Sequence, residues 1–347
     1  MSLLRVYFTQ RQILLVIVAL TLSPFLAGCA TSPYVYQANF VPGPEMEWDV
    51  EESQFERGER KPILDGIGWV VGIPGKILLW DRRIDNHSVS PETEAALAAY
   101  LGKNNLDQVK VRINQYDPRG EWRRLRKNKS VSWGWRYTAG TLTALHYTLL
   151  PGRILGGDNY NPFTNTINLY SDHAAVALHE GGHAKDFSSR NYKGTYAVVT
   201  ALPVLSLWPE SIATNDALGY LRAEENYEDE QEAYRVLYPA YATYIAGAAS
   251  PFLPYSDLLI TAGAVIPGHL LGRIKAREVK QEQIARLSQS ENQQVSASDP
   301  VETLPAAKIE NRDRIQQVHY EQELKHHNFV NQKRFAEVSS SAGKPVE

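Results

Sequence analysis

The segment His179-Glu180-Gly181-Gly182-His183 constrains this chain of 347 residues more than any other. On a helix, residues four apart project from the same face, so the two imidazoles would converge on one point. The preceding residues are small or apolar, which predicts a buried helix. Two buried imidazoles at this spacing are typical zinc ligands, and Glu180 is placed to take a proton from metal-bound water.

The two glycines are unusual inside a helix. Each costs a helix interior about 1 kcal/mol relative to alanine, so we expect close packing against another element at Gly181 and Gly182. Asp172 is expected to cap the helix or to complement its dipole. The alternative is coincidence, because His-Glu-x-x-His arises by chance on the order of once in a hundred such chains.

A zinc site of this kind needs a third protein ligand and an open position for water. A metzincin would have Gly and then His at fixed spacing after the motif, but this chain has Asp186 and Ser189 there. That class is therefore excluded. The remaining source is a carboxylate from a later helix, and the acidic run between Glu224 and Glu232 offers several.

Helical periodicity selects one member of this run. A metal ligand must lie on the inward face of its helix, which is marked downstream by Ala233 and Leu237. Counting back three and seven residues selects Glu230 as the third ligand. The remaining candidates are Asp229, which is nearly as well placed, and then Glu228 and Glu232.

The N-terminus predicts export and a lipid anchor. Arg5 and Arg11 flank an apolar run, Ile13 to Leu22, that is too short for a stable transmembrane helix. Leu26-Ala27-Gly28-Cys29 then resembles the lipobox of bacterial lipoproteins, which implies a signal peptide over 1–28 and a lipidated Cys29 carrying palmitate among its acyl chains. Ala30 stands where Asp would be the usual inner-membrane retention signal, so we expect the outer membrane, facing the periplasm. The alternatives are an ordinary signal peptide or a short anchor helix.

Composition excludes several classes of protein. Cys29 is the only cysteine, so neither disulfides nor cysteine-ligated metal sites are possible once it carries lipid. The net charge of −3 gives no reason to expect nucleic acid as a partner. We expect the membrane, through Cys29, and a protein or peptide substrate as the partners.

The pattern along the chain predicts four segments. After the signal peptide, 29–60 is expected to be an extended tether, 61–287 the main domain, and 288–347 a polar linker, a charged helix and a disordered tail. The main domain includes an apolar hairpin, 238–271, divided near Pro251 to Pro254. Each arm is shorter than the ~20 residues of a membrane span, so we expect it to be buried or to rest at an interface.

Local signals predict several elements of the main domain. Ser90 as N-cap, Pro91 and Gly102 predict a helix between them. Alternation over 109–113 predicts a half-exposed strand. The basic segment from Arg119 to Lys129 is expected to be a solvated face. A second strand is expected at Thr166 to Leu169.

The stretch from Asn161 through Phe187 resembles the core of gluzincin metallopeptidases, above all the membrane-associated group that includes CAAX-processing and heat-shock proteases. Glu230-Gln231-Glu232-Ala233 matches the later motif of that group, whose first Glu is a ligand. Tyr234 departs from it by replacing an Asp, which leaves a role beside the ligands unfilled or taken by Asp186 or Asp229. The resemblance covers about a third of the chain.

This resemblance implies an α+β, mainly helical fold with a zincin-like core: a short sheet, an active-site helix and a second ligand-bearing helix. It implies a zinc metallopeptidase acting on envelope proteins, with His179, His183 and Glu230 as ligands and Glu180 as the base. The strand Thr166 to Leu169 would pair with an extended substrate. The candidates for the oxyanion donor are Tyr192, Tyr241, Tyr244 and His269.

Two other functions stay open at this point. One is a non-catalytic envelope lipoprotein in which zinc is a structural staple or a binding platform. The intact Glu180 argues against it, because a structural site needs no general base. The other is a zinc hydrolase of a non-peptide amide, which the sequence does not separate from a peptidase.

Overall fold

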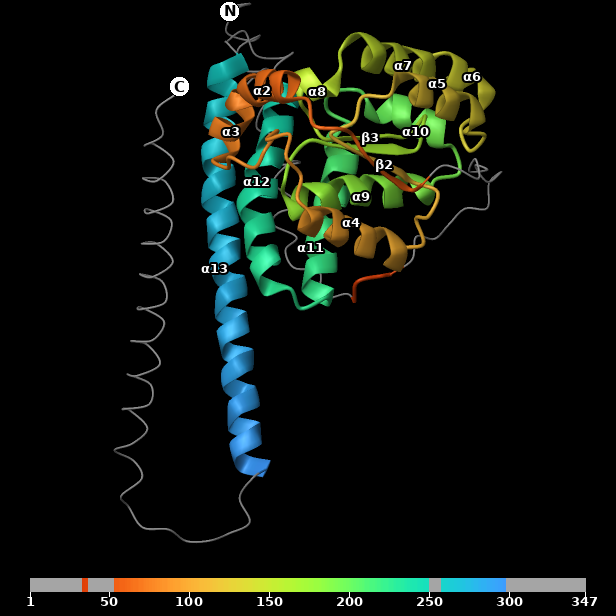
Figure 1. The fold of residues 1–347 in the computed structure, drawn as a ribbon. Coiled ribbons are helices and arrows are strands. Elements are labelled where there is room, and N and C mark those ends of the chain that lie inside the picture. The colour runs from red at the N-terminus through yellow and green to blue at the C-terminus, as the bar shows by residue number, and fades with distance from the viewer. Residues whose placement is uncertain (1–32, 37–52, 250–256, 298–347) are drawn as a thin grey trace, which may run out of the picture. The chain divides into compact units, whose positions relative to one another are not determined.

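The computed structural model describes residues 33–36, 53–249 and 257–297, of which 257–259 and 291–297 are described for the backbone alone (Figure 1). The chain divides into two compact units, residues 1–286 and 287–347. Only the end of one helix is described in the second unit. Cys29, the expected hairpin turn near Pro251 to Pro254 and the expected charged C-terminal helix lie outside the described residues.

The fold is mainly helical with one small mixed sheet, as expected. The sheet has four strands in the order β1-β2-β4-β3. β1 pairs with β2, and β2 with β4, in parallel, whereas β3 pairs with β4 antiparallel. The strands are β1 (Phe55–Arg57), β2 (Lys110–Ile113), β3 (Asn159–Asn161) and β4 (Thr166–Leu169). β4 is therefore an interior strand, and the expectation that it pairs with a substrate is wrong; β3 forms the edge.

Strand β2 is buried at all four residues, so the predicted half-exposed strand is wrong in its exposure. Its polar side chains are satisfied inside the protein. Lys110 donates to the carbonyl oxygen of Ser53 at 2.6 Å, and Arg112 forms a buried ion pair with Glu121. Alternation of apolar and polar residues indicates an exposed face only where the polar residues lack such partners.

Helix α9 (Ala174–Ser188) packs against β3 and β4, and three helices surround it: α4 (Pro91–Lys103), α11 (Leu207–Ala223) and α12 (Tyr227–Ala249) (Figure 1). Most of the main core lies between these helices and the sheet. The other helices are α2 (Pro62–Val71), α3 (Ile73–Leu79), α5 (Pro118–Lys127), α6 (Trp133–Tyr137), α7 (Ala139–Leu149), α8 (Gly152–Leu155), α10 (Lys193–Thr200) and α13 (Asp257–Ala297).

The helix predicted from Ser90 is confirmed as α4, and the Ser90 hydroxyl accepts from the Thr93 amide at 3.3 Å. Asp172 does not cap α9 as expected. Its carboxylate instead accepts from the Ser90 amide at 2.8 Å and from the Thr93 hydroxyl at 2.7 Å. The N-cap of α9 is His173, whose ring nitrogen accepts from the Ala175 amide at 3.2 Å. Asp172 thus ties the start of α4 to the loop before α9.

The expected solvated basic face is wrong for part of α5. Arg124 is only 2% exposed, and its guanidinium donates to the carbonyl oxygens of Thr164 and Asn165, each at 2.9 Å. These two residues form the turn between β3 and β4. The buried cation therefore fixes the hairpin that leads into α9.

The segment expected to be a tether contributes two pieces to the fold. Phe55–Arg57 is strand β1 of the sheet. Earlier in the chain, the Tyr34 hydroxyl donates to Asp216 at 3.0 Å and accepts from Lys185 at 2.8 Å, which places it against α11 and α9. At the other end, α13 continues to Ala297, where the sequence predicted a linker from Ser288.

Within the described residues, no single helix is both long enough and apolar enough to cross a membrane. One bent pair of helices meets the length and hydropathy criteria together, α2 with α3, which meet at an angle of 48°. This pair lies outside the apolar hairpin that the sequence singled out.

Candidate metal centre

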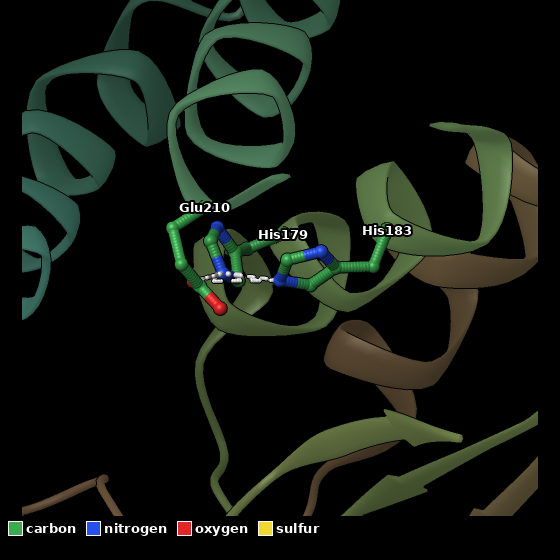
Figure 2. Close-up of side chains that lie close together, drawn as sticks. All are labelled: His179, His183 and Glu210. Atoms are coloured by element: carbon green, nitrogen blue, oxygen red, sulfur yellow. Dashed lines mark hydrogen bonds and ion pairs between the residues drawn. The ribbon is translucent and has the colours of Figure 1, made fainter. Parts of the chain in front are cut away.

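Three side chains from two helices converge on one point (Figure 2). His179 and His183 lie one turn apart on α9, and Glu210 lies in the first turn of α11. The Nε2 atoms of the two histidines are 3.1 Å apart. Oε2 of Glu210 lies 3.1 Å from Nε2 of His179 and 3.4 Å from Nε2 of His183. The three donor atoms thus form a nearly regular triangle.

The size of this triangle fits a tetrahedral metal ion. Zinc binds imidazole nitrogen and carboxylate oxygen at about 2.0–2.2 Å, so the edge of a regular ZnN₂O tetrahedral face is about 3.3 Å. The three separations in the protein lie on either side of that value. Two imidazoles and one carboxylate are also a ligand set that zinc uses when a fourth position stays open.

Close packing between α9 and α11 brings the ligands together. A Cβ atom at Gly182 would lie 2.9 Å from the backbone Cα of Ala213, closer than real side chains approach. On the neighbouring face, a Cβ atom at Gly181 would lie 2.6 Å from the ring of Tyr100 on α4. The expected close packing at both glycines is confirmed.

The centre is largely withdrawn from solvent. The side chains of His179, His183 and Glu210 are 10%, 12% and 13% exposed, respectively. Thr214, one turn after Glu210 on α11, places its hydroxyl 3.4 Å from Nδ1 of His179. A contact of this kind orients an imidazole so that the other ring nitrogen faces the metal.

Glu210 is held in its ionised form by its neighbours. Burial alone would raise the pKa of this carboxyl, but the charge of His183 and the hydrogen bonds from both histidines hold the pKa well below its ordinary value. A carboxylate in the first turn also lies at the positive end of the dipole of α11. An anionic oxygen beside two imidazoles is the state in which a divalent cation is bound.

Glu180 lies beside this triangle and is only 5% exposed. Burial, opposed by the charge of His179 and reinforced by the charges of Glu210 and Asp158, raises the pKa of Glu180 to about 8. The backbone amide of Tyr160, on edge strand β3, donates to the carboxyl. A cation at the adjacent triangle would favour the ionised form again, because opposite charges lower the pKa of a carboxyl.

The expected third ligand, Glu230, lies elsewhere. It is 0% exposed on α12, so the prediction that it faces inward is right, but it accepts from Nε of Arg222 at 2.9 Å and is not in the group around the histidines. The other candidates also have different surroundings. Asp229 accepts from Asn226, Glu232 pairs with Arg83, and Glu228 is exposed.

Glu210 was missed because it lies outside the acidic run. The chain order places two helices, α10 and α11, between the motif and the run, and α11 is the element that packs on α9 through Gly182. The sequence feature that could have indicated Glu210 is Pro209 directly before it, because Pro followed by Glu is typical of a helix start. The same pattern usually reflects the helix dipole alone, so it did not single out a ligand.

Of the four candidate oxyanion donors, the structure brings Tyr244 to the centre. The residue is 40% exposed, but its hydroxyl hydrogen-bonds to Glu210, and the withdrawal of that hydroxyl from water together with the charges of Glu210 and Glu180 raises its pKa well above the usual range. It therefore stays a donor. Tyr241 donates to the Leu207 carbonyl oxygen, His269 bonds to that of Leu78, and Tyr192 is 80% exposed.

Tyr234 replaces the Asp that would act beside the ligands, and neither Asp186 nor Asp229 takes over that role. Asp186 pairs with Arg190 and accepts from the Tyr196 hydroxyl at 2.7 Å, whereas Asp229 bonds to Asn226. In this chain the contact to a ligand imidazole comes from Thr214.

No protein-family model, curated protein or solved structure matches the chain.

Proposed function

We propose that the protein is a zinc-dependent metallopeptidase of the bacterial envelope, with His179, His183 and Glu210 as ligands and Glu180 as general base. One observation carries the proposal. A triangle of two imidazoles and a carboxylate, with edges of 3.1–3.4 Å, lies beside a buried carboxyl that has no ligand role. A purely structural zinc site has no use for that carboxyl.

The chemistry divides between the ion and the chain. Zinc, when bound, supplies a Lewis acid for a scissile carbonyl and lowers the pKa of water to about 7. Glu180 takes a proton from the water as its oxygen attacks the scissile carbonyl and forms the new C–O bond. It then delivers that proton to the leaving nitrogen as the C–N bond breaks. Tyr244, whose single O–H meets Glu210 in the structure, would turn from that carboxylate to donate a hydrogen bond to the developing oxyanion.

Edge strand β3 is the element for aligning a peptide. Its pairing with β4 leaves its other edge toward Glu180, where the amide of Tyr160 already meets the carboxyl. An extended substrate that adds to this edge would run its backbone past the base. We therefore expect the substrate to pair with β3 and not with β4.

The test uses the full-length protein in detergent micelles and an unfolded, fluorescently labelled polypeptide as substrate. We expect one zinc per chain and cleavage that is abolished by a chelator and restored by added zinc. Glu180→Gln should retain zinc and lose cleavage. Stoichiometric zinc without any cleavage would indicate a zinc-binding protein, and cleavage that Glu180→Gln retains would exclude Glu180 as the base. Cleavage of small amides without cleavage of polypeptides would indicate a different hydrolase.

The proposed location follows from the N-terminus. Acyl chains on Cys29 would hold the domain at the envelope, with the outer membrane as the proposed site. Labelled fatty acid should enter the protein but not a Cys29→Ser variant. Equal labelling of the two would overturn the anchor, and wild-type protein in the inner-membrane fraction would overturn the proposed membrane.

A further inference from the structure

Helices α2 and α3 expose their apolar side chains and engage their charged ones with neighbouring groups, which is the reverse of ordinary surface helices. Only two residues over 62–79 carry a charge, Asp65 and Lys76, and both are engaged by neighbouring groups. Asp65 accepts from Nε of Arg153 at 2.7 Å. The Lys76 ammonium, whose residue is 7% exposed, donates to the carbonyl oxygens of Trp69 and Asp85, each at 3.0 Å.

The apolar side chains of the same pair point outward. Ile63 is 80% exposed, Val70 57%, Ile77 64% and Trp80, directly after α3, 59%. Ile67, Trp69 and Val71 are exposed as well. Single exposed apolar residues are normal, but a run of them on two consecutive helices marks a surface that meets an apolar partner.

Backbone packing prevents the pair from turning this face inward. A Cβ atom at Gly68 would lie 2.5 Å from the carbonyl oxygen of Arg153, and one at Gly72 would lie 2.6 Å from Cβ of Asp85. Gly68 on the inner face of α2 and Gly72 directly after this helix are therefore close contacts that leave no room for a side chain. Its exposed apolar residues cannot be buried by a small rotation of the helix.

The first half of α13 extends this surface. His269 bonds to the Leu78 carbonyl oxygen at 2.8 Å, and its ring stacks on Trp80 at 3.9 Å, so α13 lies directly beside α3. The exposed residues of α13 here are again apolar, with Ile266 at 65% and Leu270 at 61%.

Cations stand at the ends of this apolar segment. Arg60 and Lys61 precede α2 and are exposed, and Arg82 is exposed just after Trp80. The Arg273 guanidinium lies 4.6 Å from the centre of the Trp80 ring. Apolar side chains flanked by tryptophan and cations match the boundary between acyl chains and anionic headgroups.

We propose that the surface formed by Ile63, Val70, Ile77, Trp80, Ile266 and Leu270 inserts into the outer part of a phospholipid bilayer. Each helix, of ten and seven residues or about 15 and 10 Å, is too short to cross a core of about 30 Å by itself. The pair, bent by 48°, is held against the domain by Asp65 and Gly68, which both lie against Arg153. They lie in the interface and set the orientation of the domain on the membrane. This contact is independent of the proposed peptidase activity.

A depth measurement tests the proposal. Cysteine replaces Ile77 in the full-length protein, and an environment-sensitive fluorophore is attached after reconstitution into vesicles of phosphatidylethanolamine and phosphatidylglycerol. Labelling of the wild type measures any signal from Cys29. The matched control is Glu92→Cys, at an exposed polar position on α4. Retained helical content and zinc content show that both variants are folded.

We expect blue-shifted emission and strong quenching by spin-labelled lipid at position 77, and water-like emission without such quenching at position 92. Water-like emission at position 77 would overturn the proposal. So would blue-shifted emission that lipid spin labels do not quench but that is accompanied by energy transfer between differently labelled copies, because the surface would then be a protein interface.

Discussion

Two buried glutamates on neighbouring helices have opposite surroundings. Glu210 meets two imidazoles, and their charges and hydrogen bonds hold its pKa below the ordinary value despite burial. Glu230 accepts a hydrogen bond from the guanidinium of Arg222, and burial raises its pKa in spite of that partner. Both side chains face inward, but only Glu210 lies beside other groups that could bind a cation. Burial of a carboxylate thus does not identify a metal ligand; its partners do.

The largest effect is expected at Glu180, the proposed base beside Glu210. Glu180→Gln removes the proton acceptor but none of the three ligands, so polypeptide cleavage should fall about 10²–10⁴-fold while zinc content is unchanged. Cleavage rate and elemental analysis on the same preparation measure both. Loss of zinc together with activity would show that Glu180 is a ligand instead.

A smaller effect is expected where α9 meets α11. Gly182→Ala places a methyl group against the backbone of Ala213, and the resulting displacement of α11 would move Glu210 away from the histidines. We expect a loss of about 1–3 kcal/mol in unfolding free energy, measured by urea denaturation, and weaker zinc binding. The control is Gly102→Ala on α4, where the added methyl meets nothing within 4 Å. Equal behaviour of the two variants would contradict the role of the close contact.

The smallest effect is expected at the residue that orients His179. Thr214→Val keeps the shape of the side chain and removes the hydroxyl 3.4 Å from Nδ1. Zinc affinity should fall about tenfold, at the low end for contacts that orient a ligand. Competition with a chromogenic chelator measures it, with Thr243→Val as the control because that hydroxyl bonds within α12 to Ala240. Unchanged zinc affinity would show that Thr214 does not orient His179.

Local sequence rules predicted the parts of the molecule that depend on neighbouring residues. The Ser90 cap, the helix that carries the histidines and the tight packing at its glycines all follow from the chemistry of a few adjacent positions. Periodicity also found the inward face of α12, where Glu230 is buried.

The parts that were wrong depend on contacts between distant segments. Lys110 is buried because Ser53 lies beside it, and Arg124 because it fixes the turn between β3 and β4. Glu210 becomes part of the centre because α11 packs closely on the motif helix at Gly182 and brings its first turn to the histidines. Helix α12 also packs on the motif helix, but its Glu230 bonds to Arg222. The period of a single helix carries no information on which helix lies next to it.

The central claim is that Glu210, and not Glu230, completes the metal centre. Zinc content per chain of Glu210→Ala and Glu230→Ala, purified side by side without chelator, tests it most directly. We expect Glu210→Ala to lose stoichiometric zinc, because two imidazoles hold the metal poorly, and Glu230→Ala to retain it despite some loss of stability from the lost ion pair with Arg222. Full zinc in Glu210→Ala together with loss of zinc from a folded Glu230→Ala would contradict the account.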